Sequence, residues 1–376
     1  MTRIGVFGGG QLARMLTQAA IPLGLETVIF EPAADSPAGR LTQHEVVGSW
    51  DDPAALERFA AQCDLVTLEN EFVDAQILAT LETRGMPVYP SAATLGLIQD
   101  KLIQKQTLAA AQVPVAPFRA ADEPAQVLAA ADELGWPLVL KARRNGYDGY
   151  GNATLRGLGD LAPAWARLSA SGSPLMLEAW VPFRRELAVM VARSRDGQTA
   201  AYPVVETIQR DHICHVVRAP AAVNPTTAHA AVDLAVAAVT AVAGVGIFGV
   251  ELFELPDGSL RYNEMAPRPH NSGHYTIEAC VTSQFENHLR AVLGWPLGST
   301  DLRTPAAVMI NLLGRRVGPI HPDVLRPALA IPGAHLHLYG KRVARVGRKL
   351  GHVTALGASL AEAELLARQA ADLIEV

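Results

Sequence analysis

The sequence predicts a multidomain protein of the α/β and α+β classes, and three observations support this. In residues 1–90, short apolar runs alternate with helical patterns, as in a parallel sheet wound by helices. Residues 113–177 combine one helical pattern with apolar runs around a glycine-rich loop, which is typical of a small α+β unit. Residues 178–300 contain apolar runs joined by short turns, which predicts a larger antiparallel sheet. A length of 376 residues also exceeds that of one domain, for which about 100–200 residues is usual.

Composition excludes several classes of protein. A hydrophobic fraction of 49% with 18% charged residues is that of an ordered globular chain. The net charge of −5, with arginines scattered along the chain, gives no basic surface for nucleic acid. Cys63, Cys214 and Cys280 lie too far apart for a metal motif, and the alanine-rich stretch 228–249 is interrupted by polar residues and glycines, unlike a membrane span. The start of the chain has no secretion signal, so we expect a cytoplasmic protein with reduced thiols.

The elements fall into four predicted domains, with boundaries at 1–98, 99–177, 178–300 and 301–376. In the first, apolar runs predict strands at 3–8, 25–31, 44–48, 64–69 and 87–90, with helices between them. A long helix over 95–112 leads out of this domain. In the second, an extended VPVAP segment precedes a helix over 123–134, a strand over 137–142, the glycine loop and a strand within 173–180.

The third domain begins with strands over 186–194 and 199–205, joined by a turn at residues 195–197. A helix over 226–243 follows. The strands 246–255 and 259–268 flank Pro256-Asp257-Gly258, which predicts a hairpin. The last domain carries the run HLHLYG, a basic stretch with glycines and a helix over 359–374.

The first glycine motif lies where an apolar run meets a helical pattern. Gly8-Gly9-Gly10-Gln11-Leu12-Ala13 satisfies G-x-G-x-x-A, the dinucleotide fingerprint. Glu31, at the end of the next apolar run, is at a suitable distance along the chain to hold a ribose. An NAD-dependent oxidoreductase is therefore one hypothesis; an anion site for another ligand is the alternative.

The second glycine loop follows a predicted strand. The run PLVLKARRNGYDGYGN places Lys141 at the end of the strand, followed by Gly146, Gly149 and Gly151. Glycines let backbone N–H groups approach phosphate oxygens, and the lysine adds a positive charge. The spacing is not that of a Walker loop. A simple hairpin turn with a surface lysine explains this segment equally well when it is taken alone.

Two acidic residues lie on the predicted hairpin of the third domain. Pairing through the turn at 256–258 would bring Glu251 and Glu264 to one face, with Asn263 beside them. Oxygen ligands of this kind suit Mg²⁺, which bridges nucleotide phosphates. A solvated hairpin with unrelated acids is the alternative. The apolar neighbours argue against it, because charged groups on buried strands normally have partners.

In this order the lysine, the glycine loop and the carboxylates resemble the ATP-grasp superfamily and, within it, the N5-carboxyaminoimidazole ribonucleotide synthetases of purine biosynthesis. The resemblance covers essentially the whole chain. It rests on GGGQLARM, KARRNGYDGYGN, ELFELPDGSLRYNEMAPRPHNSGHYTIEAC and HLYGKRVARVGRKLGHVT. It implies an ATP-grasp fold with a Rossmann-like first domain that does not hold the ATP. It also implies carboxylation of 5-aminoimidazole ribonucleotide with bicarbonate and Mg²⁺-ATP through carboxyphosphate, and a homodimer.

The resemblance also implies roles for individual residues. Residues expected at ATP are Lys101, Lys141, Gly146, Tyr147, Asp148, Gly149, Tyr150, Gly151, Asn152, Glu178, Ala179, Trp180, Val181, Glu186, Gln209, Asn263 and Glu264, with Glu251 and Glu264 at Mg²⁺. Residues expected at the ribonucleotide are Gly9, Gly10, Gln11, Leu12, Glu69, Glu71, Arg268, His270, Asn271, Ser272, Lys341 and Arg348. In particular, the substrate phosphate would be the anion at the first glycine loop. Tyr147, Asp148, Lys341 and Arg348 are expected at the reacting groups, with Asp148 positioning or deprotonating the amine. Lys341 and Arg348 would hold bicarbonate or the substrate phosphate.

The sequence departs from the usual family pattern at three places. Tyr150 stands where the family commonly has a basic residue, Gln209 where it has histidine, and residues 69–72 read ENEF instead of E-F-E-N. Two further hypotheses therefore remain. One is another ATP-grasp ligase, such as a formate-dependent glycinamide ribonucleotide transformylase or a biotin carboxylase. The other is a nucleotide-binding protein without turnover.

Overall fold

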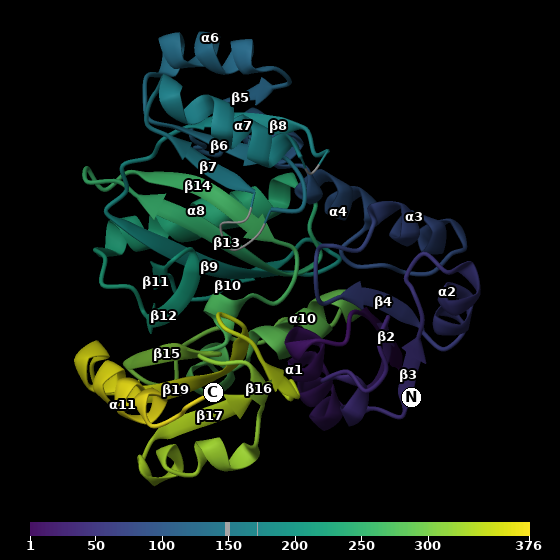
Figure 1. Ribbon diagram of the computed structural model, residues 1–376. Coiled ribbons are helices and arrows are strands. Elements are labelled where there is room, and N and C mark those ends of the chain that lie inside the picture. Colours follow the sequence, from purple (N-terminus) through teal and green to yellow (C-terminus); the bar gives the residue numbers. More distant parts are fainter. Residues whose placement is uncertain (147–150, 171) are drawn as a thin grey trace.

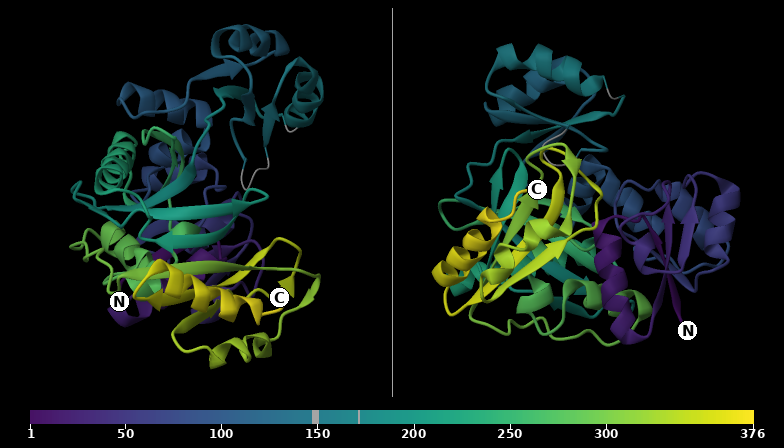
Figure 2. Two further views of the ribbon diagram at one scale, coloured as in Figure 1. Left: turned by 90° about the vertical axis from the view of Figure 1, so that its left-hand side faces the viewer. Right: turned by 60° about the horizontal axis from the view of Figure 1, so that its bottom comes forward.

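The computed structural model describes residues 1–146, 151–170 and 172–376 (Figure 1). Three sheets with their covering helices form the body of the molecule, and a two-stranded ribbon is added near the C-terminus. Figure 2 shows from two further directions that the small sheet stands at one end of the large one, while the N-terminal unit lies alongside. Within the described ranges, none of the helices combines the length and apolar character that crossing a bilayer requires.

The N-terminal unit is a parallel four-stranded sheet in the order β3-β2-β1-β4. Buried apolar side chains occupy nearly every position of β1 and β4, as expected for strands covered on both faces. The strand expected at 87–90 is absent; only an isolated bridge joins Val88 to Val66. The elements are β1 (Arg3–Phe7), α1 (Gln11–Ala20), η1 (Ile21–Leu23), β2 (Glu26–Glu31), η2 (Gly39–Leu41), β3 (His44–Val47), α2 (Pro53–Ala60), β4 (Leu65–Leu68), α3 (Ala75–Thr83) and α4 (Ala92–Gln99).

The helix predicted over 95–112 is two helices, α4 and α5, which meet at Asp100. The backbone of Asp100 is extended, and its carboxylate accepts hydrogen bonds from the N–H groups of Leu102 and Ile103. The same carboxylate pairs with Arg143, at 2.9 and 2.6 Å. Aspartate is a preferred N-cap, so the polar residue that ends one helix begins the next.

This junction gives the first prediction. Asp100 is 2% exposed, and replacing it by asparagine keeps a capping oxygen but removes the charge that pairs with Arg143. We expect Asp100→Asn to lower the free energy of unfolding by about 1–3 kcal/mol. Asp100→Ala should cost about 1 kcal/mol more, because the cap is lost too. Urea unfolding measures both. Glu133→Gln, which breaks the exposed Glu133–Arg119 pair, is the control and should change stability by under about 1 kcal/mol. Equal losses in the asparagine and control variants would contradict the prediction.

The second unit is a small antiparallel sheet in the order β5-β8-β6-β7, covered by two helices. Its core is formed by leucine, valine and alanine side chains of α6, α7 and the strands. The elements are α5 (Lys101–Ala110), β5 (Phe118–Ala121), α6 (Pro124–Leu134), β6 (Leu138–Ala142), β7 (Asn152–Leu155), η3 (Leu158–Asp160), α7 (Leu161–Ser169) and β8 (Leu175–Ala179).

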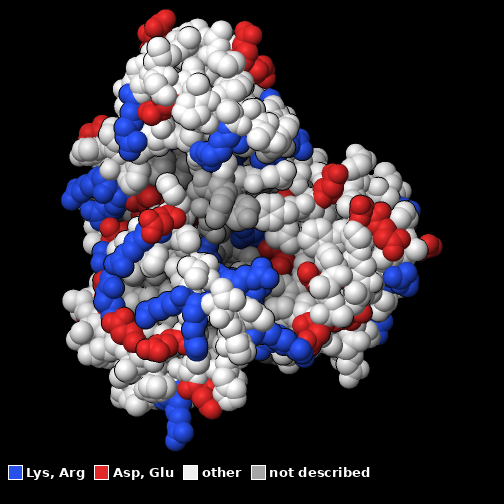
Figure 3. Space-filling model, viewed as in Figure 1, with Lys and Arg blue, Asp and Glu red and all other residues white. Residues whose placement is uncertain are grey.

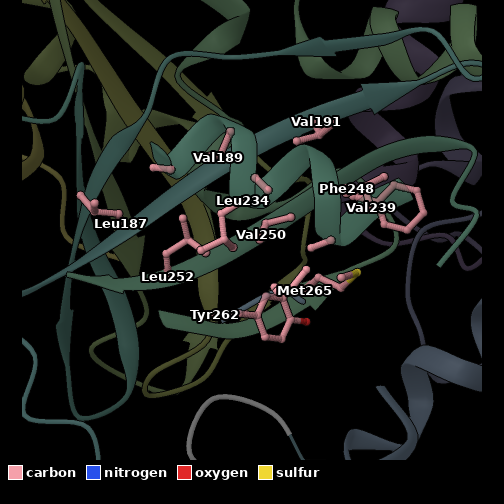
Figure 4. Packing of buried hydrophobic residues seen from close by; sticks show 14 of the residues in the cluster. Leu187, Val189, Val191, Leu234, Val239, Phe248, Val250, Leu252, Tyr262 and Met265 are labelled. Atoms are coloured by element: carbon pink, nitrogen blue, oxygen red, sulfur yellow. The ribbon is translucent and has the colours of Figure 1, made fainter. Parts of the chain in front are cut away.

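The third unit is a nine-stranded antiparallel sheet, ordered β14-β13-β9-β11-β12-β15-β19-β17, with β10 paired to β9. Alternate residues of β9 face two different cores. Leu187, Val189 and Val191 pack against Leu234 and Val239 of α8 (Figure 4). The elements up to residue 293 are β9 (Arg185–Arg193), β10 (Thr199–Ala201), β11 (Val205–Arg210), β12 (Ile213–Ala219), α8 (Pro225–Ala241), β13 (Gly246–Glu254), β14 (Leu260–Ala266), η4 (Asn271–Gly273), α9 (Thr276–Ala279) and α10 (Gln284–Leu293).

The C-terminal segment continues this sheet. β15 pairs with β12 on one side and with β19 on the other, so residues expected in two units share one set of hydrogen bonds. Helix α11 packs on β15 and β19 through small alanine side chains. The elements are β15 (Ala306–Leu313), β16 (Gly318–Pro319), η5 (Pro322–Leu325), η6 (Ala328–Ala330), β17 (Ala334–Leu338), β18 (Val343–Ala344), β19 (Lys349–Gly357) and α11 (Leu360–Asp372).

Candidate functional site

A cleft of about 370 Å³ lies between the small sheet and the β13–β14 hairpin. Most residues predicted at a nucleotide line it: Lys101, Lys141, Gly146, Asn152, Glu178, Ala179, Trp180, Val181, Glu186, Gln209, Glu251, Asn263 and Glu264. Gly151 does not line it. Tyr147, Asp148, Gly149 and Tyr150 lie outside the described residues. Phe183 and Phe253 also line the cleft but were not predicted from the sequence. Their rings are stacked, with centroids 4.6 Å apart, and add apolar surface to the cleft that Trp180 also lines.

A buried carboxylate holds two lysines at one end of this cleft. Glu178 of β8 is 4% exposed, and its two oxygens lie 2.9 Å from Lys141 Nζ and 3.3 Å from Lys105 Nζ. Burial alone would raise the pKa of Glu178, but the lysine charges more than offset this and the pKa lies below its usual value. Lys105 is 2% exposed and was missed, although it stands one helical turn after Lys101 on α5. The structure thus gives Glu178 a side-chain role besides the backbone role expected at the adenine.

The predicted hairpin brings two carboxylates together. Glu251 on β13 and Glu264 on β14 are directly opposite, next to a β-bulge, and both line the cleft. Lys101 Nζ lies 2.8 Å from Glu264 Oε2, and its charge holds the pKa of Glu264 far below the usual range. Burial, followed by the charge of Glu264, raises the pKa of Glu251 well above normal. A carboxylate pair of this kind needs a cation, so the two residues fit the Mg²⁺ that the sequence predicted.

Glu186 and Gln209 lie on the neighbouring strands β9 and β11, and both line the cleft. Burial raises the pKa of Glu186 to about 6, while a hydrogen bond with Gln209 acts in the opposite direction. Among the described residues, Gln209 Oε1 is buried without a hydrogen-bond partner. The amide replacing the family's usual histidine therefore keeps hydrogen-bonding capacity for a ligand.

The first glycine loop already holds carboxylates of the protein. Glu69 accepts hydrogen bonds from the N–H groups of Gly10, Leu12 and Ala13, at 2.8, 3.1 and 3.1 Å, at the N-terminus of α1. Glu31, the residue considered for a ribose, accepts one from Gly9 N at 2.6 Å. In this structure four N–H groups of the loop thus donate to carboxyl oxygens of the protein, and burial raises the pKa of Glu69. A substrate phosphate at these N–H groups would have to displace the carboxyl groups, and the same holds for a dinucleotide, so the phosphate contact of this loop stays a prediction.

Arg268 and Glu71 were both expected at the ribonucleotide, and the structure pairs them with each other. The guanidinium bridges both carboxylate oxygens, with Nη2 at 2.8 Å from Oε1. Burial would raise the pKa of Glu71, but the charge of Arg268 more than offsets this and the pKa lies below normal. Both residues line the first cleft, as do His270 and Asn271; Ser272 and Leu12 line neither cavity. Ser272 is 1% exposed and instead hydrogen-bonds His270 Nδ1.

A second cavity, of about 620 Å³, lies between the first glycine loop and the C-terminal segment. Gly9, Gly10, Gln11 and Glu69 line it from one side, and a basic group lines it from the other: Lys341, Arg342, Arg345 and Arg348. On the face shown in Figure 3, Lys and Arg side chains gather below the central hollow. Of the basic residues in this C-terminal group, only Lys341 and Arg348 were predicted from the sequence as site residues. Arg40, which also lines the cavity, had no sequence signal.

Two chain segments contribute residues to the walls of both cavities. Glu69 lines the second cavity and Glu71 the first, so the segment after β4 separates them. At the start of β19, Arg348 lines the second cavity and its neighbour Lys349 the first. Groups bound in the two cavities would therefore face each other across this boundary.

Comparison with protein families matches three consecutive segments. Residues 1–99 match the ribonucleotide synthetase preATP-grasp domain, 106–285 the ATP-grasp domain, and 307–365 the phosphoribosylaminoimidazole carboxylase C-terminal domain.

Several known proteins are similar over nearly the whole chain. An N5-carboxyaminoimidazole ribonucleotide synthase of Synechococcus elongatus is 45% identical, over 93% of this chain and 88% of its own. An Aspergillus clavatus synthase, solved with ADP and 5-aminoimidazole ribonucleotide, is 37% identical with a TM-score of 0.91, covering 99% of this chain and 98% of its own. The chloroplastic phosphoribosylaminoimidazole carboxylase of Vigna aconitifolia is 43% identical over 96% of this chain, which spans 65% of the plant protein's length.

Proposed function

The chain belongs to the N5-carboxyaminoimidazole ribonucleotide synthase family of ATP-grasp proteins, and from this we propose that it carboxylates 5-aminoimidazole ribonucleotide in purine biosynthesis. The reaction consumes ATP and bicarbonate and gives N5-carboxyaminoimidazole ribonucleotide, ADP and phosphate. The observation that carries the proposal is the shared wall between an ATP-sized cleft and a basic second cavity. ATP and the ribonucleotide must both come close to bicarbonate in this reaction, and two adjoining cavities would let the two nucleotides bind side by side.

The first step transfers the γ-phosphoryl group to bicarbonate. A bicarbonate oxygen attacks phosphorus and ADP leaves, which gives carboxyphosphate. Lys101 and Lys141 line the cleft and can offset the charge of the transferred group. Glu251 and Glu264 would hold Mg²⁺, which would supply further positive charge to offset that of the transferred group. Glu186 and Gln209 would bind the ribose hydroxyls, and the backbone of residues 178–181 the adenine.

The second step joins the amine of the ribonucleotide to the activated carbon. The amine nitrogen attacks carbon, phosphate leaves, and the amine loses a proton. Asp148, which lies outside the described residues, is proposed from the family resemblance to position the amine or to accept this proton. In the second cavity, Lys341 and Arg348 would hold the phosphate of the ribonucleotide, since they face the cavity and Arg offers paired N–H donors. Glu69, Gly9, Gly10 and the side chain of Gln11 would contact its ribose or ring. Water must be excluded from carboxyphosphate. We therefore propose that the reaction takes place at the boundary of the two cavities.

The test is ADP release from Mg²⁺-ATP and bicarbonate, with and without aminoimidazole ribonucleotide. We expect a strong rise on adding the ribonucleotide and formation of N5-carboxyaminoimidazole ribonucleotide. ADP release that requires formate and glycinamide ribonucleotide instead would establish the rival ligase. ATP binding without turnover would show that Tyr150 and Gln209 have ended the chemistry. Light scattering after gel filtration tests the homodimer that the family implies.

Lys341 gives a pH prediction for the same reaction. Burial, with a smaller effect of Arg348, lowers the pKa of Lys341 to about 8. Its ammonium is therefore present below pH 8 and lost above it, so the KM for the ribonucleotide should rise about tenfold between pH 7 and pH 9. In Lys341→Arg the guanidinium stays charged, and the rise should be much smaller. An equal rise in both proteins would contradict the assignment of Lys341 to the phosphate.

A further inference from the structure

Three side chains with metal-binding atoms meet away from both cavities. Glu278 lies on α9, and His337 and His352 are cross-strand partners on β17 and β19. The two imidazole rings stack with centroids 4.4 Å apart. One potential ligand atom from each of the three residues lies within 4.8 Å of the others. Neither of the proposed substrate sites uses these residues.

Two atoms of this cluster are buried without a hydrogen-bond partner among the described residues: His352 Nε2 and Glu278 Oε2. His352 is fully buried, and the Glu278 side chain is 10% exposed. The Glu278–His337 hydrogen bond, at 2.6 Å, satisfies only Glu278 Oε1 and His337 Nε2. Buried polar atoms of this kind normally have partners, because leaving them unpaired costs about 1–3 kcal/mol each.

The surroundings of His352 prepare it as a ligand. Its Nδ1 lies 2.9 Å from the hydroxyl of Tyr339, which is itself buried. When Nδ1–H donates to this hydroxyl, Nε2 carries a lone pair that points into the cluster.

We propose that Glu278, His337 and His352 form a site for a divalent transition-metal ion of the zinc type, with water as the fourth ligand. Two imidazoles and one carboxylate suit such a borderline ion better than the hard ions Mg²⁺ and Ca²⁺. This site does not depend on the proposed function. Ligands at about 2.0 Å from zinc lie about 3.3 Å apart. Glu278 Oε1 and His337 Nε2, now 2.6 Å apart, must therefore open slightly, and the more widely spaced ligand atoms must close around the ion. His337, 25% exposed, leaves an entry path from solvent.

The ion would link three segments that carry residues of both cavities. Helix α9 follows the segment with His270 and Asn271, β17 leads to Lys341, and β19 begins at Lys349. A bond from each segment to one ion would replace a single Glu278–His337 hydrogen bond. The proposed role is therefore structural.

The experiment uses the full chain without an affinity tag, stripped with a chelator and kept in Mg²⁺. Excess Mg²⁺ is kept because the Glu251–Glu264 pair, the proposed Mg²⁺ site, would otherwise compete for the added metal. Calorimetric titration with Zn²⁺ should give one ion per chain with a raised melting temperature. Titration with Co²⁺ should give the visible absorption of a four-coordinate site with nitrogen ligands.

The variants separate this site from adventitious binding. His337→Gln, at a partly exposed position, should weaken zinc binding at least about tenfold, and Tyr339→Phe about tenfold through the lost support of His352. His321→Gln is the matched control, because His321 and Asp323 form an exposed pair, 3.1 Å apart; it should bind zinc as the unaltered chain does. No stoichiometric zinc binding, or equal affinity in His337→Gln and the unaltered chain, would overturn the proposal and leave water as the partner of the two buried atoms.

Discussion

Replacing Glu264 by glutamine is expected to lower kcat for ATP cleavage by about 10²–10³-fold. Glu264 faces Glu251 across the hairpin and lies 2.8 Å from Lys101. The glutamine keeps the shape of the side chain but removes the negative charge that the proposed Mg²⁺ and Lys101 both need. The variant should also require a higher Mg²⁺ concentration for half-maximal rate. Steady-state ADP release at saturating ATP and bicarbonate, over a series of Mg²⁺ concentrations, measures both effects.

The control is Glu286→Gln on α10. Glu286 pairs with Arg290 one helical turn away, and both side chains are 29% exposed. This substitution removes the same charge at a place that lines neither cavity, so the rate and its Mg²⁺ dependence should stay unchanged. If Glu264→Gln also left both unchanged, the carboxylate pair would not be the metal site.

Replacing Glu178 by glutamine is expected to lower the free energy of unfolding by about 3–5 kcal/mol. The substitution leaves Lys105, 2% exposed, and Lys141 without their opposite charge inside the protein. A buried ammonium with no counter-charge must lose its proton or draw in water, and either costs stability. Urea unfolding at pH 7, followed by circular dichroism, measures the loss.

The double variant Glu178→Gln/Lys105→Met distinguishes this cause from a general packing defect. Removing the lysine charge together with the carboxylate leaves less uncompensated charge, so the double variant should recover at least about 2 kcal/mol of the loss. Lys105→Met alone should cost less than Glu178→Gln, because Glu178 keeps Lys141. A double variant as unstable as Glu178→Gln would contradict the charge explanation.

The parts of the fold that depend on local patterns were predictable. The hairpin that carries Glu251 and Glu264 follows from two apolar runs and the Pro256-Asp257-Gly258 turn between them, and the structure has this hairpin. The β-bulge between Glu251 and Leu252, which sets the two carboxylates directly opposite, was not predicted. The split at Asp100 was not predicted, because an aspartate that caps a new helix looks like any polar residue within a longer one. Element boundaries depend on single side-chain bonds of this kind.

The parts that depend on distant partners were not predictable. Arg268 and Glu71 are 197 residues apart, and nothing local indicates that they pair. Lys105 was missed because lysine is rarely buried, and only the fold places it beside Glu178. Glu69 was assigned to a ligand, yet it caps α1 from 57 residues away at Leu12. In each case the partner of the side chain, a charged group or a set of backbone N–H groups, lies far away in the sequence.

The large sheet is continuous across the boundary between two matched family segments. This limits which segments could be exchanged with those of a related protein. The C-terminal segment 307–365 matches a family domain of its own. In the structure, however, its strand β15 is hydrogen-bonded to β12 on one side and to β19 on the other. Exchanging it would expose the edge of β12 and require the donor strand to reproduce the register Val216–Ile310 through Ala219–Ala307. Val216, Val308 and Ala363, from three different segments, pack in one cluster. The part of this chain that could be exchanged without breaking strand pairing is the whole segment from β9 to α11.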